Sequence, residues 1–212
     1  MKAKRIDASN DALLDAASPA WASALGESMS MAQTPLMLTK EVSPFLALGQ
    51  DHGAIENLQA AALHNGRMLA VRLQWAAPKY DRIVDLDSFV DGAAVLFPLV
   101  RGAPAVTMGA PGKPTNAWYW KANKPEPYEV VAEGFASVQR VAGRSDLKAV
   151  AQYRDGQWNV VLGRSLGKAD GLVKLEPGGS TKIAFAVWSG GNAERSGRKS
   201  FSGEFVDLEI LK

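Results

Sequence analysis

The stretch AALHNGRMLAVRLQW, residues 61–75, predicts a β-hairpin and with it the fold class. The pair Asn65-Gly66 in its middle favours a two-residue turn, because both residues tolerate positive φ. The second arm alternates, with one face made of Leu69, Val71, Leu73 and Trp75 and the other of Ala70, Arg72 and Gln74. A period of two is typical of a half-buried antiparallel strand.

Strand-like segments separated by turn residues fill most of the chain after residue 50. They cover 93–100, 116–122, 128–132, 147–166 with a turn at Asp155-Gly156, 181–191 with Ile183, Phe185 and Val187 on one face, and 203–211. About nine or ten strands result, and little sequence remains for long helices. We predict an all-β fold with few short helices: a single, mostly antiparallel β-sandwich over residues 1–212.

Residues 1–50 lack this regularity and are expected to form an irregular segment that wraps the sandwich. The stretch 11–21 is compatible with a short helix ended by Pro19. Two prolines interrupt 33–48, which favours an edge strand or coil. The stretch 54–63 stays open, because its residues favour a helix whereas its position before the hairpin turn favours a strand.

The composition excludes several classes of site. The chain has no cysteine, which rules out thiolate zinc sites, iron–sulfur clusters held by this chain and covalently attached haem. Its two histidines, His52 and His64, are too few for a histidine-rich metal centre. A net charge of +2 with scattered Lys and Arg does not indicate a nucleic-acid partner. No stretch predicts a membrane span, and the start MKAKRIDASND lacks the apolar run of a signal peptide.

Catalysis by this chain is not the favoured interpretation. Asp85, Asp87 and Asp91 are close enough in sequence to bind calcium or exchange protons, but a solvated turn accounts for them. His64 adjoins the hairpin turn and is expected at the surface, so a small hydrolase built on it is the weakest alternative. No nucleophile-elbow motif and no phosphate-binding glycine loop is present.

An unusual methionine lies in TMGAPGKPTNAWYWKA, residues 107–122, among prolines and before a run of aromatics. Methionine normally fills gaps in a core, but the turn-rich setting of Met108 indicates a surface pocket for a large planar ligand. The aromatic run also supports an alternative function. A carbohydrate-binding module would stack sugars on Trp118, Tyr119 and Trp120.

Two segments, AVTMGAPGKPTNAWYWKAN (105–123) and KIAFAVWSGGNAERSGRKSFSGEF (182–205), together resemble a known family. They are similar to the haem b-binding γ subunits of periplasmic molybdenum enzymes of the dimethyl-sulfoxide-reductase family. The likeness is greatest to ethylbenzene dehydrogenase and its relatives acting on hydrocarbon or steroid side chains. It extends from about residue 40 to the end and includes SDLKAVAQYRDGQWNVVLGRS (145–165).

The resemblance implies a β-sandwich in which Met108 and Lys199 are the two axial ligands of a haem b iron. Arg195 and Arg198 are candidates to contact the haem propionates, with solvation at the surface as the alternative. Trp118 and Tyr119 are candidates to line the pocket, but packing into the sandwich core is the favoured interpretation for both. With both axial positions filled by protein, such a haem carries electrons and does not activate substrate.

The resemblance also implies partners. A molybdenum-cofactor α subunit, carrying out anaerobic C–H hydroxylation, would pass electrons through an iron–sulfur β subunit to this non-catalytic chain. A soluble acceptor such as cytochrome c would then receive them. We expect a periplasmic heterotrimer, with this chain exported within the complex because no signal peptide of its own is visible.

Overall fold

A computed structural model of the chain describes residues 1–35, 37–38, 51–85, 89–141, 146–167 and 170–212. It confirms the all-β class, and the described part holds a sheet of 14 strands. The strands are β1 (Lys2–Arg5), β2 (Glu27–Ser30), β3 (Ala32–Gln33), β4 (Asn57–His64), β5 (Met68–Ala76), β6 (Gly92–Pro98), β7 (Thr115–Lys121), β8 (Tyr128–Ala132), β9 (Gln139–Arg140), β10 (Lys148–Arg154), β11 (Gln157–Ser165), β12 (Ser180–Trp188), β13 (Ser200–Phe201) and β14 (Val206–Ile210). The expected count of about nine or ten was too low, because strands as short as β3, β9 and β13 show no period in the sequence.

The helices that the structure describes are short. They are α1 (Asn10–Leu14) and the 3₁₀ helices η1 (Pro19–Ser23), η3 (Phe135–Ser137) and η4 (Gly190–Asn192). The ambiguous stretch 54–63 belongs mainly to the strand β4, so tertiary pairing overrides its helical composition.

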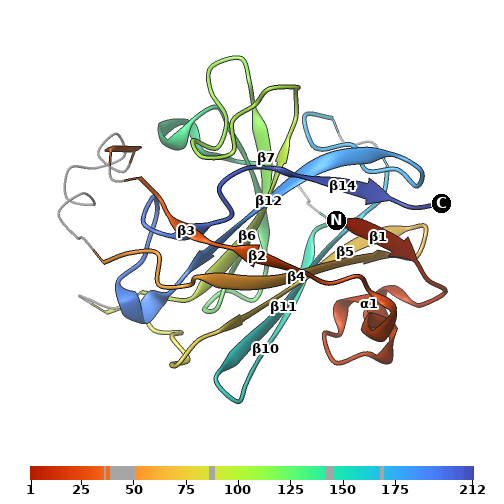
Figure 1. Cartoon of the computed structure of the whole chain (residues 1–212), viewed down its shortest axis with the longest axis horizontal. Coiled ribbons are helices and arrows are strands. Elements are labelled where there is room, and N and C mark those ends of the chain that lie inside the picture. The colour runs from red at the N-terminus through yellow and green to blue at the C-terminus, as the bar shows by residue number, and fades with distance from the viewer. Residues whose placement is uncertain (36, 39–50, 86–88, 142–145, 168–169) are drawn as a thin grey trace.

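The strands form one hydrogen-bonded path that folds into two layers. The first layer runs β10-β11-β5-β4-β1-β14, and the second runs β12-β6-β7-β8-β9. Strand β12 joins them, since 180–183 pairs with β14 and 184–188 pairs with β6. In Figure 1, β6, β7 and β12 cross β4 at a steep angle. Trp75 of β5 meets Trp120 of β7 with ring centroids 6.4 Å apart, so the layers pack face to face as a sandwich.

The core between the layers confirms the predicted inward faces. It buries the alternating residues Leu69, Val71, Leu73 and Trp75 of β5 and Ile183, Phe185 and Val187 of β12. The outward-facing Ala70 of β5 packs with Leu13 and Leu14 of α1 in a second apolar cluster. The N-terminal helix therefore covers the outside of the first layer.

Within residues 1–50 the structure describes 1–35 and 37–38, and this part contains regular strands as well as the expected irregular stretches. β1 runs parallel to both β4 and β14 and completes the middle of the first layer. The sequence did not predict β1, because most of its residues are charged and only Ala3 of the strand is buried. Pro19 begins η1 and does not end α1, which stops at Leu14. Most of the predicted edge strand or coil at 33–48 lies outside the described residues.

The two predicted hairpin turns differ in detail. Asp155 and Gly156 both have positive φ, at 52° and 73°, as expected. In the other hairpin only Gly66 does, at 84°. Asn65 instead accepts hydrogen bonds on Oδ1 from the backbone N–H groups of residues 67 and 68, at 3.0 and 2.9 Å. The centre of this turn thus lies one residue later than predicted, because the asparagine side chain caps it.

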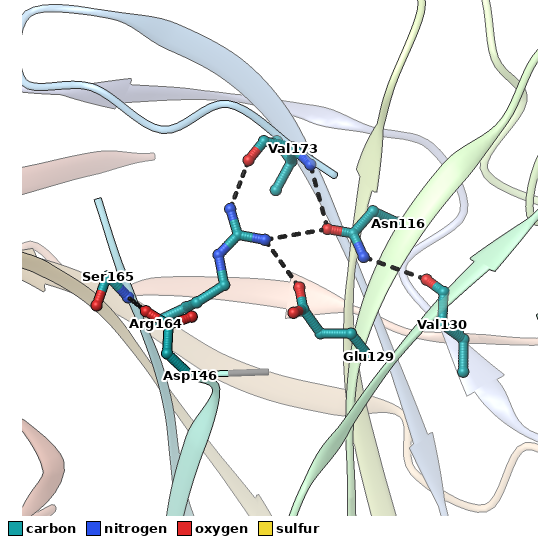
Figure 2. A network of polar contacts seen from close by, with 7 residues as sticks. All are labelled: Asn116, Glu129, Val130, Asp146, Arg164, Ser165 and Val173. Carbon is teal, nitrogen blue, oxygen red and sulfur yellow. Dashed lines mark hydrogen bonds and ion pairs between the residues drawn. The ribbon is translucent and has the colours of Figure 1, made fainter. Parts of the chain in front are cut away.

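A buried polar network ties the layers together (Figure 2). Arg164 of β11 donates from Nη1 to Glu129 Oε1 of β8 at 2.8 Å and to Asn116 Oδ1 of β7 at 3.4 Å. Its Nη2 donates to the carbonyl oxygen of Val173. Arg164 and Glu129 are each 2% exposed. The network therefore fixes the inner face of the β7–β8 pair, whose outer face carries the site described next.

Candidate functional site

A cavity of about 500 Å³ lies on the outer face of the second layer, a size typical of ligand sites. Successive residues of a strand point to opposite faces, so β7 presents Ala117, Tyr119 and Lys121 to the cavity. The other lining residues come from neighbouring strands and loops: Phe89, Ala94, Met108, Tyr128, Val130, Phe135, Val138, Trp188, Arg195, Ser196, Gly197 and Lys199. The small side chains of Ala94 on β6 and Ala117 on β7 leave space at the floor of the cavity, and aromatic rings form much of its wall.

Met108 reaches the cavity from the loop between β6 and β7. Its φ of 58° lies in the left-handed region that side-chain-bearing residues rarely adopt. Met108 N donates to the carbonyl of Ala105 at 3.0 Å, and Met108 O accepts from Gly134 N at 3.1 Å. The next residue must be glycine: at Gly109, with φ 90°, an added Cβ would lie 2.6 Å from the carbonyl oxygen of Ala132. Backbone strain that its surroundings hold in place is common at functional sites.

Lys199 reaches the same cavity from the segment between η4 and β13. It is only 4% exposed. Thr34 anchors its backbone, donating from N and Oγ1 to the Lys199 carbonyl at 3.1 and 3.3 Å. Nζ lies 4.7 Å from the centroid of Phe135 and 5.4 Å from that of Trp188. Within the described residues no carboxylate pairs with it. Burial therefore lowers the pKa of Lys199 to about 8.

The two side chains converge although 91 positions separate them in the chain. Lys199 Nζ donates to Met108 Sδ at 3.8 Å. One soft thioether and one amine whose pKa is depressed form a donor set that fits the iron of a haem.

Two of the four candidate pocket residues, Tyr119 and Arg195, line the cavity, whereas Trp118 and Arg198 do not. Tyr119 lines the cavity, and burial raises its pKa above the usual value. Arg195 also lines it, with its guanidinium 4.2 Å from the centroid of Phe89. Trp118 does not, because it points into the core and packs on Phe97 at 4.9 Å. Arg198 is half-buried beside the site but is not among the residues that line the cavity.

The sequence did not single out Lys121, Tyr128, Phe135 or Trp188, which the structure adds to the lining. One signal was present for Lys121. It follows Tyr119 by two positions on one strand, so the two side chains share a face. The others come from separate strands and loops, and only the folded chain brings them together.

The structure does not provide the aromatic stacking surface that the carbohydrate-binding alternative requires. Trp118 and Trp120 are 0% and 6% exposed and belong to the core, whereas Tyr119 lies on the opposite face of β7. Three consecutive strand residues cannot form one surface, because their side chains alternate.

The candidates for catalysis have structural roles. His64 is fully buried, not at the surface as expected. Its Nε2 donates to the carbonyl of Leu211 at 2.8 Å, and burial lowers its pKa. Asp91 is buried too, and its carboxylate accepts from Trp158 Nε1 at 2.8 Å and Gly190 N at 2.9 Å. Burial raises the pKa of Asp91 despite these bonds. Asp87 lies outside the described residues, and Asp85 is exposed.

Two absences hold for the part of the chain that the structure describes. It contains no group of three or more His, Asp or Glu side chains placed to hold a metal ion. None of its helices is long and apolar enough to cross a membrane.

Solved structures with a similar fold are carbohydrate-binding proteins of low sequence identity. A family 9 carbohydrate-binding module from Caldicellulosiruptor kristjanssonii, in complex with glucose, aligns over 100% of this chain and 96% of its own with TM-score 0.53 and 10% identity. A provisionally assigned carbohydrate-binding protein from Bacteroides uniformis aligns over 98% and 97% with TM-score 0.55 and 9% identity. At such identities the likeness shows the fold alone.

Sequence relatives are subunits of oxidoreductases. A protein from Haloferax mediterranei, provisionally named a respiratory nitrate reductase haem subunit, is 37% identical over 70% of this chain and 54% of its own length. The chlorate reductase subunit gamma of Ideonella dechloratans is 35% identical over 74% and 66%. The dimethylsulfide dehydrogenase subunit gamma of Rhodovulum sulfidophilum is 29% identical over 79% and 66%. The chain thus spans between about half and just under two thirds of these relatives.

The model of one protein family, ethylbenzene dehydrogenase, matches residues 18–142 and 138–200. These ranges include the Met108 loop, the β7–β8 wall and Lys199, and they cover most of the chain. The chain therefore belongs to the ethylbenzene dehydrogenase family.

Proposed function

We propose that this chain is the electron-transfer subunit of a molybdenum oxidoreductase complex and that its cavity binds one haem b, with Met108 and Lys199 as axial ligands. The observation that carries the proposal is the meeting of Met108 Sδ and Lys199 Nζ, 3.8 Å apart, in a cavity rimmed by aromatic rings. The name of the Haloferax mediterranei relative supports a haem.

A haem held in this way supplies reversible one-electron transfer. The chain's own residues prepare the site. Lysine can ligate only as the neutral amine, and the burial that lowers the pKa of Lys199 to about 8 favours that form. The Met108 thioether is a soft ligand that favours the reduced metal. With Met108 and Lys199 as the two proposed axial ligands, no position would stay open for substrate, and the role would be to carry electrons.

The proposed partners follow from the relatives. Two of them are gamma subunits, of chlorate reductase and of dimethylsulfide dehydrogenase. We place this chain likewise beside a molybdenum-cofactor α subunit and an iron–sulfur β subunit in the periplasm. Electrons from an ethylbenzene dehydrogenase-like C–H hydroxylation would leave through this haem to a cytochrome c. Co-purification of the three chains from a periplasmic fraction tests this assembly.

The haem and its ligands are tested by spectroscopy of the purified complex. We expect a b-type reduced-minus-oxidised spectrum. Met108→Ala and Lys199→Ala should each change the spectrum and the midpoint potential, or lower the haem occupancy. Met37→Ala and Lys148→Ala are matched controls, because both side chains are exposed and neither lines the cavity. If both site variants keep the native spectrum and occupancy, the ligand assignment is wrong.

A further inference from the structure

A side chamber of about 120 Å³ opens beside the main cavity. The two share lining residues, among them Tyr119, Lys121, Trp188 and Arg195, so a ligand in the main cavity can extend into the chamber. Lys124 and Glu194 line only the chamber. The aromatic part of the site and its charged part therefore lie next to each other, with Tyr119 and Lys121 at the boundary.

The chamber carries an excess of positive charge. Three cationic side chains, Lys121, Lys124 and Arg195, face a single carboxylate, Glu194, which leaves a formal charge of 3 − 1 = +2. None of the three forms an ion pair with any residue that the structure describes. Lys121 is half-buried, whereas Lys124 and Arg195 are exposed at the mouth of the chamber, so an anion entering from solvent can meet all three positive charges.

Glu194 forms no ion pair with these three cations, because its oxygens accept hydrogen bonds from other groups. Oε1 accepts from the backbone N–H groups of Gly53 and Ala54 at 2.7 and 2.8 Å, and Oε2 accepts from Ser189 N at 2.9 Å. The residue is 1% exposed. The hydrogen bonds of the Glu194 carboxylate link three backbone positions and stabilise the wall of the chamber.

Lys121 is partly withdrawn from water, which disfavours its charged form. It is half-buried, and its Nζ lies 5.5 Å from the ring centroid of Tyr119. Burial lowers the pKa of Lys121, and the charges of Lys124 and Arg140 lower it further. An anion placed between these groups would oppose this lowering, because an opposite charge stabilises the protonated amine.

We propose that the side chamber is a dicarboxylate site, in which Lys121, Lys124 and Arg195 bind the two carboxylates of the tetrapyrrole whose ring fills the main cavity. This inference rests on the proposed function and extends it. The formal charge of the chamber, +2, complements two carboxylates. The shared residues place the charged end of the ligand at the Tyr119 side of the cavity, and Arg198, which lines neither space, is not part of the carboxylate site.

Binding of iron protoporphyrin IX and of its dimethyl ester to the haem-free full-length chain tests the site. The ester keeps the ring and the iron but has no carboxylate charge. We expect the wild-type chain to prefer the free acid. Relative to binding of the ester, binding of the free acid should weaken about 5- to 10-fold in Lys121→Met and about 2- to 5-fold in Lys124→Met. Lys148→Met, an exposed lysine outside both spaces, is the charge-matched control.

The outcomes separate this proposal from the one on which it rests. If wild-type and both variants bind acid and ester in the same ratio, the carboxylate site is wrong while haem binding stands. If the wild-type chain binds neither compound, the proposed function fails and the carboxylate site with it. Lys124 is exposed, so its variant should fold even if Lys121→Met is less stable. Raising the salt concentration should weaken acid binding to the wild type more than to a variant that combines Lys121→Met with Lys124→Met.

Discussion

Replacing Lys199 by methionine should stabilise the haem-free chain at neutral pH. The substitution gives a side chain of similar volume that is one atom shorter, and it removes an ammonium that is buried without an ion-pair partner among the described residues. A buried cation is costly, whereas a thioether of similar volume can stay among Phe135, Trp188 and Met108.

The size of the effect follows from the pKa of Lys199. Burial lowers it from 10.5 to about 8, and each unit corresponds to about 1.4 kcal/mol, which gives about 3 kcal/mol in all. The unfolded chain binds the proton up to about pH 10.5, while the folded chain releases it near pH 8. Between these values the unfolded state holds more protons, so the free energy of unfolding rises with pH. Below pH 8 the full cost is present, and above about pH 10.5 it has disappeared.

Chemical denaturation of the haem-free full-length chain from pH 7 to pH 10.5 measures this. The informative quantity is the difference in unfolding free energy between Lys199→Met and wild type. It should be about 3 kcal/mol at pH 7, as an upper bound, and should shrink as the pH rises. Burial raises the pKa of Tyr119 and raises that of Tyr128 to about 12, which destabilises the folded chain at high pH. Both tyrosines are present in both proteins, so their effect cancels. A difference that stays constant across this range would refute the reasoning.

Two further variants test the polar network and the Met108 loop. Arg164→Leu removes the guanidinium from buried Glu129 and should lower the unfolding free energy in denaturant titrations by about 3–5 kcal/mol. The double variant, Arg164→Leu with Glu129→Leu, should recover part of this loss. A loss under about 1 kcal/mol in the single variant would contradict this expectation. Gly109→Ala should cost about 2 kcal/mol or more, because its φ is 90° and the new Cβ would meet a carbonyl oxygen at 2.6 Å. Gly112→Ala, with φ 70° and no neighbour within 4 Å, is the matched control in the same loop, and an equal cost for both would show that the close contact is not what matters.

Regular strands were predictable because burial imposes a period on them. The inward residues of β5 and β12 were identified from alternation alone, and both predicted hairpins are present, although most of the first arm of one had been left open between helix and strand. β1 was missed for the opposite reason. It is paired on both sides by backbone hydrogen bonds yet buries only Ala3, so its role in the sheet leaves almost no trace in hydropathy. The Asn65 turn was misplaced by one residue because a side-chain cap competes with the positive-φ geometry.

The site depends on the fold in a different way. Nothing in spacing links Met108 to Lys199, and only the resemblance to a family paired them before the structure brought them together. For Trp118, the sequence itself could have decided between the pocket and the core. If Tyr119 faces a ligand cavity from a strand, its neighbours on either side must face the core, which is where Trp118 and Trp120 lie.

The position of the lysine on this sandwich makes it usable as a ligand near neutral pH. An ordinary lysine with a pKa of 10.5 would have to lose its proton about 3.5 units above pH 7, which costs about 5 kcal/mol. Burial among Phe135 and Trp188 lowers the pKa to about 8, so only about 1.4 kcal/mol is left for the metal to supply. The rest of the deprotonation cost appears as a lower free energy of unfolding of the haem-free chain. The Arg164–Glu129 network behind the β7–β8 wall and the backbone bonds that hold Met108 and Lys199 keep that strained arrangement in place. A site built in this way gains stability when its ligand binds, because the amine is then stabilised in the form that burial already favours.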